Sequence, residues 1–400
     1  MHQIYNLGIC IYGLLIRVAA LFNKKARKWI DGRHNFFKNL PDLPQKPICW
    51  VHCASLGEFD MALPVLRKIK EKKPEYYLVV TFFSPSGMEH YQKRQHPIDL
   101  ALYLPLDTPK NAKRFMNYLK PELGIIVKYE FWHNHILEAK KNGSKLFSVG
   151  TILRKNQHYF KPFGGFFRKT LMLFDCFFTQ NENTIELLTA IGIKQSVLTG
   201  DPRIDQVIQN KKQFKPNTRI EMFLQGRKAF IIGSSWIADE KILFPYLIQN
   251  ADLPIIIAPH EIGEANITRI EKSLYGLTQR YSEENSNDKN ILILNTIGHL
   301  NSAYHYGSYA YVGGGFSGRL HNILEPAVFG LPVIFGPYHN RFPEAQAFID
   351  NGIGFSVSTT EEIHKISKLV FENHNMLRVK AESYVEGQSG TDDKIISAMF

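Results

Sequence analysis

YVGGGFSGRLHNILEPAVFGLPVIFGP, residues 311–337, is the stretch that decides the predicted fold. Its apolar lead-in predicts a buried strand that ends at three consecutive glycines, and a second strand is expected at 333–335. Glycine tolerates positive φ and lets a ligand approach the backbone closely. An apolar run with helical spacing follows His321, with Glu325 in its first turn and Gly330-Leu331-Pro332 at its end. A strand, a glycine loop and a helix amino-terminus suit a phosphate, although an ordinary turn with structural glycines fits equally well.

The rest of the chain repeats this alternation of apolar strands and helical patterns. Strands rich in apolar residues that alternate with helices predict a parallel sheet covered on both faces. In the first half we expect strands at 48–53, 77–83, 100–104, 123–127, 146–150, 176–179 and 197–199. In the second half we expect them at 229–232, 254–258, 291–294, 309–312 and 333–335.

A polar, basic stretch at 206–228 interrupts the alternation and predicts a linker with a short helix. The interpretation is therefore α/β, with one doubly wound, Rossmann-like domain at 46–205 and a second at 229–385. Residues 386–400 are expected to form a carboxyl-terminal helix after the glycines near 387–390. Two such domains would face a central cleft at the carboxyl ends of their strands, where ligands bind in this class of fold.

Composition favours a folded protein with an anionic partner. The 400 residues are 44% hydrophobic and 21% charged, which suits two domains with buried cores. The formal charge of +11 favours nucleic acid, anionic lipid or a phosphorylated substrate. The four cysteines are scattered in apolar contexts, so buried thiols in a reducing compartment are expected. The spacing of His, Cys, Asp and Glu predicts no metal site, and Walker and GxSxG motifs are absent from the sequence.

The amino-terminus, residues 1–45, predicts a membrane anchor and a basic juxtamembrane segment. Ile4–Phe22 is apolar apart from Asn6 and a single charge, Arg17, and is about long enough to cross a bilayer. Six basic residues follow against one acid, Asp31, which places that side in the cytoplasm and would attract anionic headgroups. The six are Lys24, Lys25, Arg27, Lys28, Arg33 and Lys38. A spanning or a monotopic helix is expected, with a buried amphipathic helix as the alternative.

Charged residues at strand ends of the first half are candidates for chemistry. Glu58 follows the first strand at a helix start, where a carboxylate is either stabilised by the helix dipole or serves as a general base. Glu130 follows another strand in an aromatic context and is either a hydrogen-bonded edge residue or a second site carboxylate. Arg203 either pairs with Asp201 or Asp205 or holds an anion.

Two strand-end loops of the second half, Gly233–Trp236 and Ala258–Glu261, are candidates for ligand contact. His260 lies in the second loop. A lone histidine in such a place is more often structural than a ligand contact. These two loops alone therefore do not identify a binding site.

Taken in order, these segments resemble the 3-deoxy-D-manno-octulosonic acid (Kdo) transferases of lipopolysaccharide assembly. The resemblance runs from the amino-terminal anchor to near the carboxyl end, and several motifs in the right order are far more specific than any one. The motifs that carry it are Ala54–Glu58, Glu130–Asn134, Gly233–Trp236 with Glu240, His321–Ala327 and Phe329–Val333.

The resemblance implies a B-type glycosyltransferase fold and inverting transfer of Kdo from CMP-Kdo to a lipid A precursor, a tetraacyl disaccharide bisphosphate. Glu58 matches the family's general base. Glu130 and Arg203 match the groups that stabilise the transition state, Arg203 standing where a lysine is usual. The cytidine monophosphate would be held by Pro259, His260, Gly298, His299, Leu300, Asn322, Ile323, Leu324 and Glu325.

Other expectations come with this resemblance. The donor departs with its own nucleotide monophosphate, so no metal or other cofactor is expected. The expected location is the inner membrane, with the catalytic domains on the cytoplasmic face, anionic lipids as partners and no nucleic acid. A glutamate in a first helical turn can accept hydrogen bonds from two ribose hydroxyls, which agrees with the placing of Glu325.

The sequence departs from the family pattern in places. His133 stands where a proline is usual, His299 replaces a usual acid, and an arginine near Pro259 is missing. Residues 150–161 do not match the family pattern. Two alternatives stay open: a related B-type transferase or epimerase that uses a UDP-sugar, and a non-catalytic basic binding module tethered to the membrane.

Overall fold

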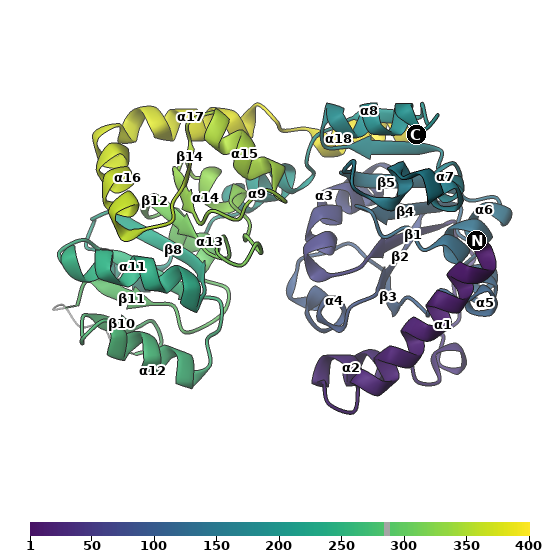
Figure 1. Ribbon diagram of the computed structural model, residues 1–400, viewed down its shortest axis with the longest axis horizontal. Coiled ribbons are helices and arrows are strands. Elements are labelled where there is room, and N and C mark those ends of the chain that lie inside the picture. Colours follow the sequence, from purple (N-terminus) through teal and green to yellow (C-terminus); the bar gives the residue numbers. More distant parts are fainter. Residues whose placement is uncertain (284–288) are drawn as a thin grey trace. The chain divides into compact units, whose positions relative to one another are not determined.

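The computed structural model describes residues 1–283 and 289–400 (Figure 1). It divides into two compact units. Unit 1 comprises residues 1–206 and 390–400, and unit 2 comprises residues 207–389. Each unit contains a seven-stranded sheet in which every strand pair is parallel. The α/β class and the two parallel sheets predicted from the sequence are confirmed.

The sheet of unit 1 has the strand order β3-β2-β1-β4-β5-β6-β7. Its central strands are wholly buried and almost entirely apolar, because helices cover both faces. On β1 the buried Trp50 donates its indole N–H to Thr81 on β2, at 2.9 Å. The strands are β1 (Ile48–Cys53), β2 (Tyr77–Phe82), β3 (Leu100–Tyr103), β4 (Leu123–Val127), β5 (Lys145–Thr151), β6 (Cys176–Thr179) and β7 (Ser196–Leu198).

In the sheet of unit 1 a helix lies between each strand and the next along the chain, as a doubly wound topology requires. These helices are α3 (Leu56–Lys72), α4 (Pro85–His90), α5 (Pro109–Leu119), α6 (His133–Lys141), α7 (Gly165–Leu171) and α8 (Glu182–Ala190). Short 3₁₀ turns are η1 (Phe36–Lys38), η2 (Tyr91–Lys93), η3 (His158–Phe160) and η4 (Pro162–Gly164).

The last helix of the chain, α18 (Thr391–Met399), belongs to unit 1 and packs against α3. Its Ile395 and Ile396 lie in the same apolar core as the α3 side chains. The Asp205 carboxylate accepts the N–H groups of Gly390 and Asp392, at 2.7 and 3.0 Å. The chain therefore returns to its first unit at the end, which the sequence did not predict.

The sheet of unit 2 has the strand order β10-β11-β9-β8-β12-β13-β14. The three-residue edge strands β10 and β14 were missing from the predicted set, because Thr-Gln-Arg and Gly-Phe-Ser carry no apolar run. The strands are β8 (Ala229–Ser235), β9 (Ile255–Pro259), β10 (Thr278–Arg280), β11 (Ile291–Ile293), β12 (Gly307–Val312), β13 (Val333–Phe335) and β14 (Gly354–Ser356).

Helices lie between most of the successive strands of this sheet and after the last one. They are α11 (Ile237–Gln249), α12 (Glu264–Ser273), α13 (Leu300–Tyr304), α14 (Leu324–Ala327), α15 (Pro343–Asp350), α16 (Thr360–Glu372) and α17 (His374–Glu386). The stretch expected to be a linker is more helical than predicted, because α9 (Arg203–Lys212) and α10 (Thr218–Leu224) occupy most of it.

The amino-terminal segment folds as two helices, α1 (His2–Ala19) and α2 (Lys24–Asp31), and α1 lies along the outside of unit 1 (Figure 1). Within residues 1–283 and 289–400, no single helix combines the length and the apolar composition needed to cross a bilayer. α1 and the segment Lys24–Lys38 meet that requirement only together, across a bend of 120°. The predicted anchor is therefore not confirmed.

One side of α1 is buried against unit 1 and the other is not. Ile9, Gly13 and Ala20 are buried. The apolar side chains on the opposite side remain between 49% and 65% exposed, so α1 is buried on one side only. They are Ile4, Leu7, Ile11, Leu14, Leu15 and Val18.

Candidate functional site

Glu58 lies in the first turn of α3, directly after β1. Its carboxylate accepts the backbone N–H groups of Ala54 and Ser55, which closes the helix start. Burial, together with the charge of Glu130, raises the pKa of Glu58 to about 7 against the opposing effects of Lys128 and of the two backbone hydrogen bonds. A carboxylate that exchanges its proton near neutral pH is suited to general base catalysis.

Glu130 follows β4, the neighbour of β1 in the sheet. The two carboxylates therefore lie at the same end of the sheet, the one formed by the carboxyl ends of its parallel strands. Burial raises the pKa of Glu130. Lys128, between β4 and Glu130, has a left-handed backbone with φ of 60°. Such a conformation is uncommon outside glycine and marks a tightly constrained strand end. The structure thus brings two of the three predicted catalytic residues together.

Arg203 begins α9 and pairs with Asp201, with Nε 2.9 Å from Oδ2. Burial alone would raise the pKa of Asp201, but the guanidinium outweighs it and the pKa is lowered. Of the two acids considered from the sequence, Asp201 is the partner, whereas Asp205 binds the start of α18. The pair holds the guanidinium in a defined place after β7.

An aromatic series connects α1 and α2 with the segment that carries Glu130. Phe83, after β2, stacks on Trp132 with ring centroids 4.8 Å apart. Its ring also lies 6.3 Å from Tyr12 of α1 and 5.6 Å from Trp29 of α2. Trp132 is two residues from Glu130. The amino-terminal helices are therefore part of the surroundings of the predicted catalytic carboxylates.

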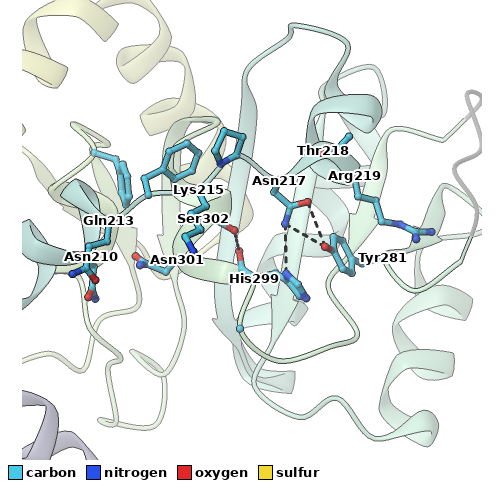
Figure 2. A pocket seen from close by; sticks show the side chains of 14 residues that line it. Asn210, Gln213, Lys215, Asn217, Thr218, Arg219, Tyr281, His299, Asn301 and Ser302 are labelled. Atoms are coloured by element: carbon cyan, nitrogen blue, oxygen red, sulfur yellow. Dashed lines mark hydrogen bonds between the residues drawn. The ribbon is translucent and has the colours of Figure 1, made fainter. Parts of the chain in front are cut away.

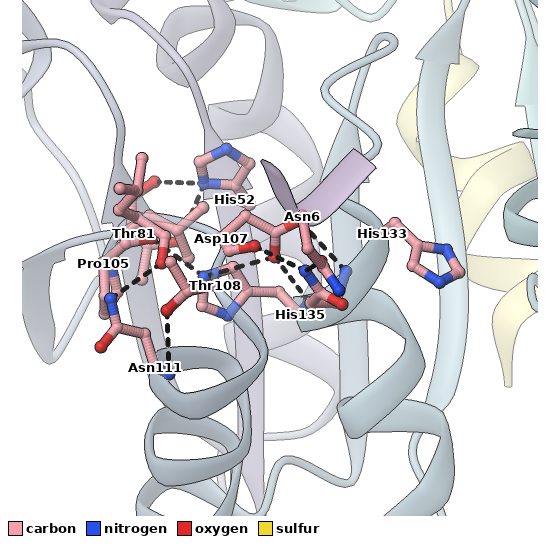
Figure 3. A network of polar contacts seen from close by, with 12 residues as sticks. Asn6, His52, Thr81, Pro105, Asp107, Thr108, Asn111, His133 and His135 are labelled. Atoms are coloured by element: carbon pink, nitrogen blue, oxygen red, sulfur yellow. Dashed lines mark hydrogen bonds and ion pairs between the residues drawn. The ribbon is translucent and has the colours of Figure 1, made fainter. Parts of the chain in front are cut away.

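A buried polar network fixes the start of α6, immediately after that segment (Figure 3). The carboxylate of Asp107, 1% exposed, accepts the N–H groups of Asn134 and His135 at 3.1 and 2.9 Å. It also accepts the hydroxyl of Tyr5 from α1, at 2.6 Å. The backbone N–H of His133 donates to the same hydroxyl, and its ring shares a hydrogen bond with Thr170.

This network explains how the chain accommodates His133, one of its departures from the family pattern. A non-proline residue here carries an N–H that needs a partner, and α1 supplies it. The sequence did not single out Asp107. Its position after the third strand, in a Pro-Leu-Asp turn before a helix, was the signal available.

In unit 2 a buried carboxylate organises the glycine loop. Asp239, in the first turn of α11, accepts the hydroxyl of Tyr311 at 2.8 Å and the N–H of Gly314 at 3.0 Å. It also accepts the N–H of Trp236 at 2.9 Å. Burial raises its pKa. No local pattern in the sequence reveals this role, because the contacts with Tyr311 and Gly314 join residues more than 70 positions apart.

The three glycines serve close packing of backbone against backbone. A Cβ on Gly313 would lie 2.2 Å from the carbonyl oxygen of Ser234, and one on Gly315 would lie 2.4 Å from the nitrogen of Gly336. Gly314 has φ of 92°. Structural reasons alone thus require glycine at each position, so the triplet is no evidence for a phosphate.

Aromatic rings gather at the carboxyl ends of β8, β9 and β12. Trp236 stacks on His260 with centroids 3.9 Å apart, and His260 lies 4.8 Å from His321. The Trp236 indole N–H donates to Nε2 of His321, at 3.2 Å. Burial and the neighbouring His260 lower the pKa of His321 to about 4, and burial lowers that of His260. The rings are therefore neutral at pH 7.

Glu325 is oriented by the residues before it. The side-chain amide of Asn322 donates to Oε1 of Glu325 at 3.2 Å and accepts the N–H of Leu324 at 3.2 Å. Ile323 and Leu324 are buried, so they position the turn rather than offer polar groups. This leaves Asn322 and Glu325 as the polar pair of the predicted nucleotide segment.

The other predicted segment, Gly298–Leu300, divides between two environments. Leu300 begins α13, and its side chain packs close to Gly233. A Cβ added to Gly233 would lie 3.3 Å from that side chain. Gly298 and His299 line a cavity of about 600 Å³ within unit 2 (Figure 2). In the cavity Asn217 bonds the Tyr281 hydroxyl, at 3.2 Å, and Nδ1 of His299, at 3.4 Å.

That cavity is polar and basic. Lys215 and Arg219 line it, and none of its lining residues is acidic. The other predicted nucleotide-binding residues, Pro259, His260 and Asn322–Glu325, do not line this cavity. The structure therefore brings His260 close to His321, one residue before Asn322, and places His299 in a separate environment. In the part of the chain that the structure describes, no group of three His, Cys, Asp or Glu residues is arranged to hold a metal ion.

Comparisons with known proteins agree with the motifs. Residues 29–206 match the family model described as 3-Deoxy-D-manno-octulosonic-acid transferase (kdotransferase). A 3-deoxy-D-manno-octulosonic acid transferase of Aquifex aeolicus is 29% identical over 86% of this chain and 90% of its own. Proteins of the same name from Rickettsia bellii and Haemophilus influenzae are each 24% identical, over 92% and 84% of this chain and 90% and 80% of theirs.

Solved structures with a similar fold include sugar-nucleotide epimerases. The UDP-GlcNAc 2-epimerase of Neisseria meningitidis, bound to UDP-GlcNAc, has a TM-score of 0.68 at 14% identity, over 88% of this chain and 99% of its own. The UDP-N-acetylglucosamine 2-epimerase of Rickettsia bellii has a TM-score of 0.59 at 15% identity, over 89% and 96%. At this identity the likeness concerns the fold alone, and it supports the predicted B-type architecture.

Proposed function

Because the chain belongs to the Kdo transferase family of glycosyltransferases, we propose that it transfers Kdo from CMP-Kdo to a lipid A precursor, with inversion, in lipopolysaccharide biosynthesis. The observation that carries the proposal is Glu58, whose half-buried carboxylate interacts with Glu130 and has a pKa raised to about 7. Membership of an enzyme family argues against the non-catalytic binding module.

In the proposed reaction Glu58 takes the proton of an acceptor hydroxyl. The hydroxyl oxygen then forms a bond to the anomeric carbon of Kdo, while the bond from that carbon to the phosphate oxygen breaks. CMP leaves with the electron pair. Arg203, held by Asp201, and Glu130 would stabilise the charge that develops. The leaving group is a nucleotide monophosphate, so the proposal includes no metal or other cofactor.

On the donor side, Glu325 and Asn322 would bind the ribose hydroxyls of CMP. The mutual hydrogen bond of these two side chains fixes their orientation before the ligand arrives, which lowers the entropy cost of binding. Pro259, His260, Gly298, His299 and Leu300 complete the proposed donor segments. The neutral stack of Trp236, His260 and His321 offers an apolar face with few free donors.

The direct test of this function is CMP release. Incubation with CMP-Kdo and a lipid A disaccharide bisphosphate is expected to release CMP only when the acceptor is present. Release that does not depend on the acceptor, or no release at all, would overturn the proposal.

The pH dependence follows from the raised pKa of Glu58. The base works only when deprotonated, so kcat/KM is expected to fall about tenfold for each pH unit below 7 and to level off above it. Because the charge of Glu130 raises the pKa of Glu58, Glu130→Gln should move the inflection to lower pH. A flat profile between pH 5 and 8 would remove Glu58 from the base role.

Nucleotide preference separates this function from a UDP-sugar enzyme. CMP is expected to raise the melting temperature of the protein, since a ligand that binds the folded state stabilises it by mass action. UDP at the same concentration should leave it nearly unchanged. A larger shift with UDP would favour the transferase or epimerase alternative.

We also propose that α1 binds the cytoplasmic face of the inner membrane as a monotopic helix. Its exposed apolar side chains recur at helical spacing on one side, and unit 1 holds the other side in place. Leu7→Gln with Leu14→Gln is expected to weaken vesicle binding by about tenfold or more, since each leucine loses apolar burial. A matched control is Val197→Gln with Leu198→Gln on β7, which are also exposed. Equal losses would argue against α1 as the membrane contact.

A further inference from the structure

Unit 1 also contains a cavity, of about 480 Å³, distinct from the one in unit 2. It lies between α1, the segment around the end of α2 and the start of α5. Five basic side chains line it, and none of its lining residues is acidic. The basic residues are Arg17, Arg33, His34, Lys38 and Arg114. Apolar surface from Trp29, Phe36, Phe37 and Leu106 completes the wall.

Arg33 supplies charge, but most of its guanidinium N–H groups already donate within the protein. Its guanidinium donates to the carbonyl oxygens of Trp29, Phe83 and Leu104, at 3.1, 2.9 and 2.8 Å. It also lies 3.8 Å from the centroid of the Trp29 ring. Arg33 therefore remains a fixed positive charge in the wall.

Three other cations are available for a ligand. Arg17, Lys38 and Arg114 are exposed, and Arg114 lies over the Phe37 ring at 4.3 Å. None of the ion pairs among residues 1–283 and 289–400 involves these three side chains, whereas Lys28 nearby is paired with Glu89. A cavity lined by uncompensated cations attracts an anion, and guanidinium groups suit phosphate oxygens.

The position of the cavity beside α1 indicates which class of anion it binds. Gly13 and Arg17 of α1 line it. Gly13 belongs to the buried side of α1, and Arg17 lies on the flank of the helix, between that side and the exposed apolar stripe formed by Ile4, Leu7, Ile11 and the later leucines of α1. A helix that rests in a membrane interface buries such a stripe to the depth of the headgroups and upper acyl chains. Cations beside the stripe then lie at the level of lipid phosphates.

We propose that this cavity binds the headgroup of an anionic phospholipid, with the phosphodiester held by Arg17, Lys38 and Arg114. The proposal rests on the membrane association of α1 proposed above and is independent of sugar transfer. Three of the basic residues near α1 would thus recognise the headgroup. Arg33 instead stabilises the fold through its backbone hydrogen bonds, and Lys28 is paired with Glu89.

The test measures binding to phosphatidylcholine vesicles with and without phosphatidylglycerol. Arg17→Gln with Arg114→Gln is expected to weaken binding to the anionic vesicles roughly 10- to 30-fold, with little change for the neutral ones. The control, Lys110→Gln with Lys113→Gln, removes the same charge from the same helix as Arg114 without touching the cavity. It should cost at most a few-fold. Melting temperatures of both variants confirm that unit 1 is folded.

Equal losses in the two variants would show diffuse attraction and overturn the headgroup site. Soluble glycerol phosphate is the second arm. If it stabilised the protein against heating as strongly as anionic vesicles do, the cavity would be a site for a soluble anion instead. A wild-type protein that bound neither kind of vesicle would overturn the membrane association of α1 as well, while acceptor-dependent CMP release would still stand.

Discussion

Replacing Glu58 by glutamine is expected to lower kcat by about 10²- to 10⁴-fold, the usual contribution of a general base. Glutamine keeps the shape of the side chain and an oxygen that can accept the N–H groups of Ala54 and Ser55. It cannot accept the proton of the acceptor hydroxyl. The measurement is CMP release under saturating donor and acceptor.

Two controls distinguish lost chemistry from lost structure in that variant. CMP should still raise its melting temperature as in the wild type, because the proposed donor residues belong to unit 2. The variant should also be more stable than the wild type at pH 8. The folded-state pKa of Glu58 is raised, so its contribution to stability is present below about pH 4.5 and is lost as the pH rises through 7. A variant that kept wild-type turnover would contradict the assignment.

Replacing Gly313 by alanine is expected to destabilise unit 2 by about 3 kcal/mol or more and to abolish CMP binding. The new Cβ would lie 2.2 Å from the carbonyl oxygen of Ser234 and 2.8 Å from the Cα of Ser235. Both are backbone atoms where β8 ends, so no side-chain rotation relieves the clash. The loop carrying Gly314 would then move away from Asp239.

The matched control for this substitution is Gly263→Ala, at the start of α12 in the same unit. Its Cβ would meet no atom within 4 Å, and its φ of −63° suits any residue. The expected cost is below about 1 kcal/mol. Chemical denaturation of both variants measures the difference, and equal stabilities would show that the glycine loop is not closely packed.

The sequence predicted the sheets because their strands are buried runs of apolar residues. β1, β4 and β9 all lie within a residue of the expected bounds. β10 and β14 could not be predicted, since a three-residue edge strand pairs through its backbone and needs no apolar pattern. The return of α18 to unit 1 depends on contacts between residues almost 200 positions apart, which no local pattern reveals.

The residues of the candidate site also differ in whether a local sequence pattern indicates them. Glu58 and Glu325 could be proposed from the sequence because each lies in the first turn of a helix that comes after a strand, which is a pattern of neighbours in sequence. Asp239 and Asp107 were missed because their importance comes from distant partners. The pattern of the glycine triplet suits a phosphate as well as an ordinary turn, and its geometry assigns it to packing.

The most direct test of the central claim is the mass of the lipid product after incubation with CMP-Kdo and a lipid A disaccharide bisphosphate. The proposed function predicts a product heavier than the acceptor by one Kdo residue or a whole multiple of it, and the Glu58→Gln variant should yield almost none. An acceptor of unchanged mass in the presence of active, CMP-binding protein would contradict it.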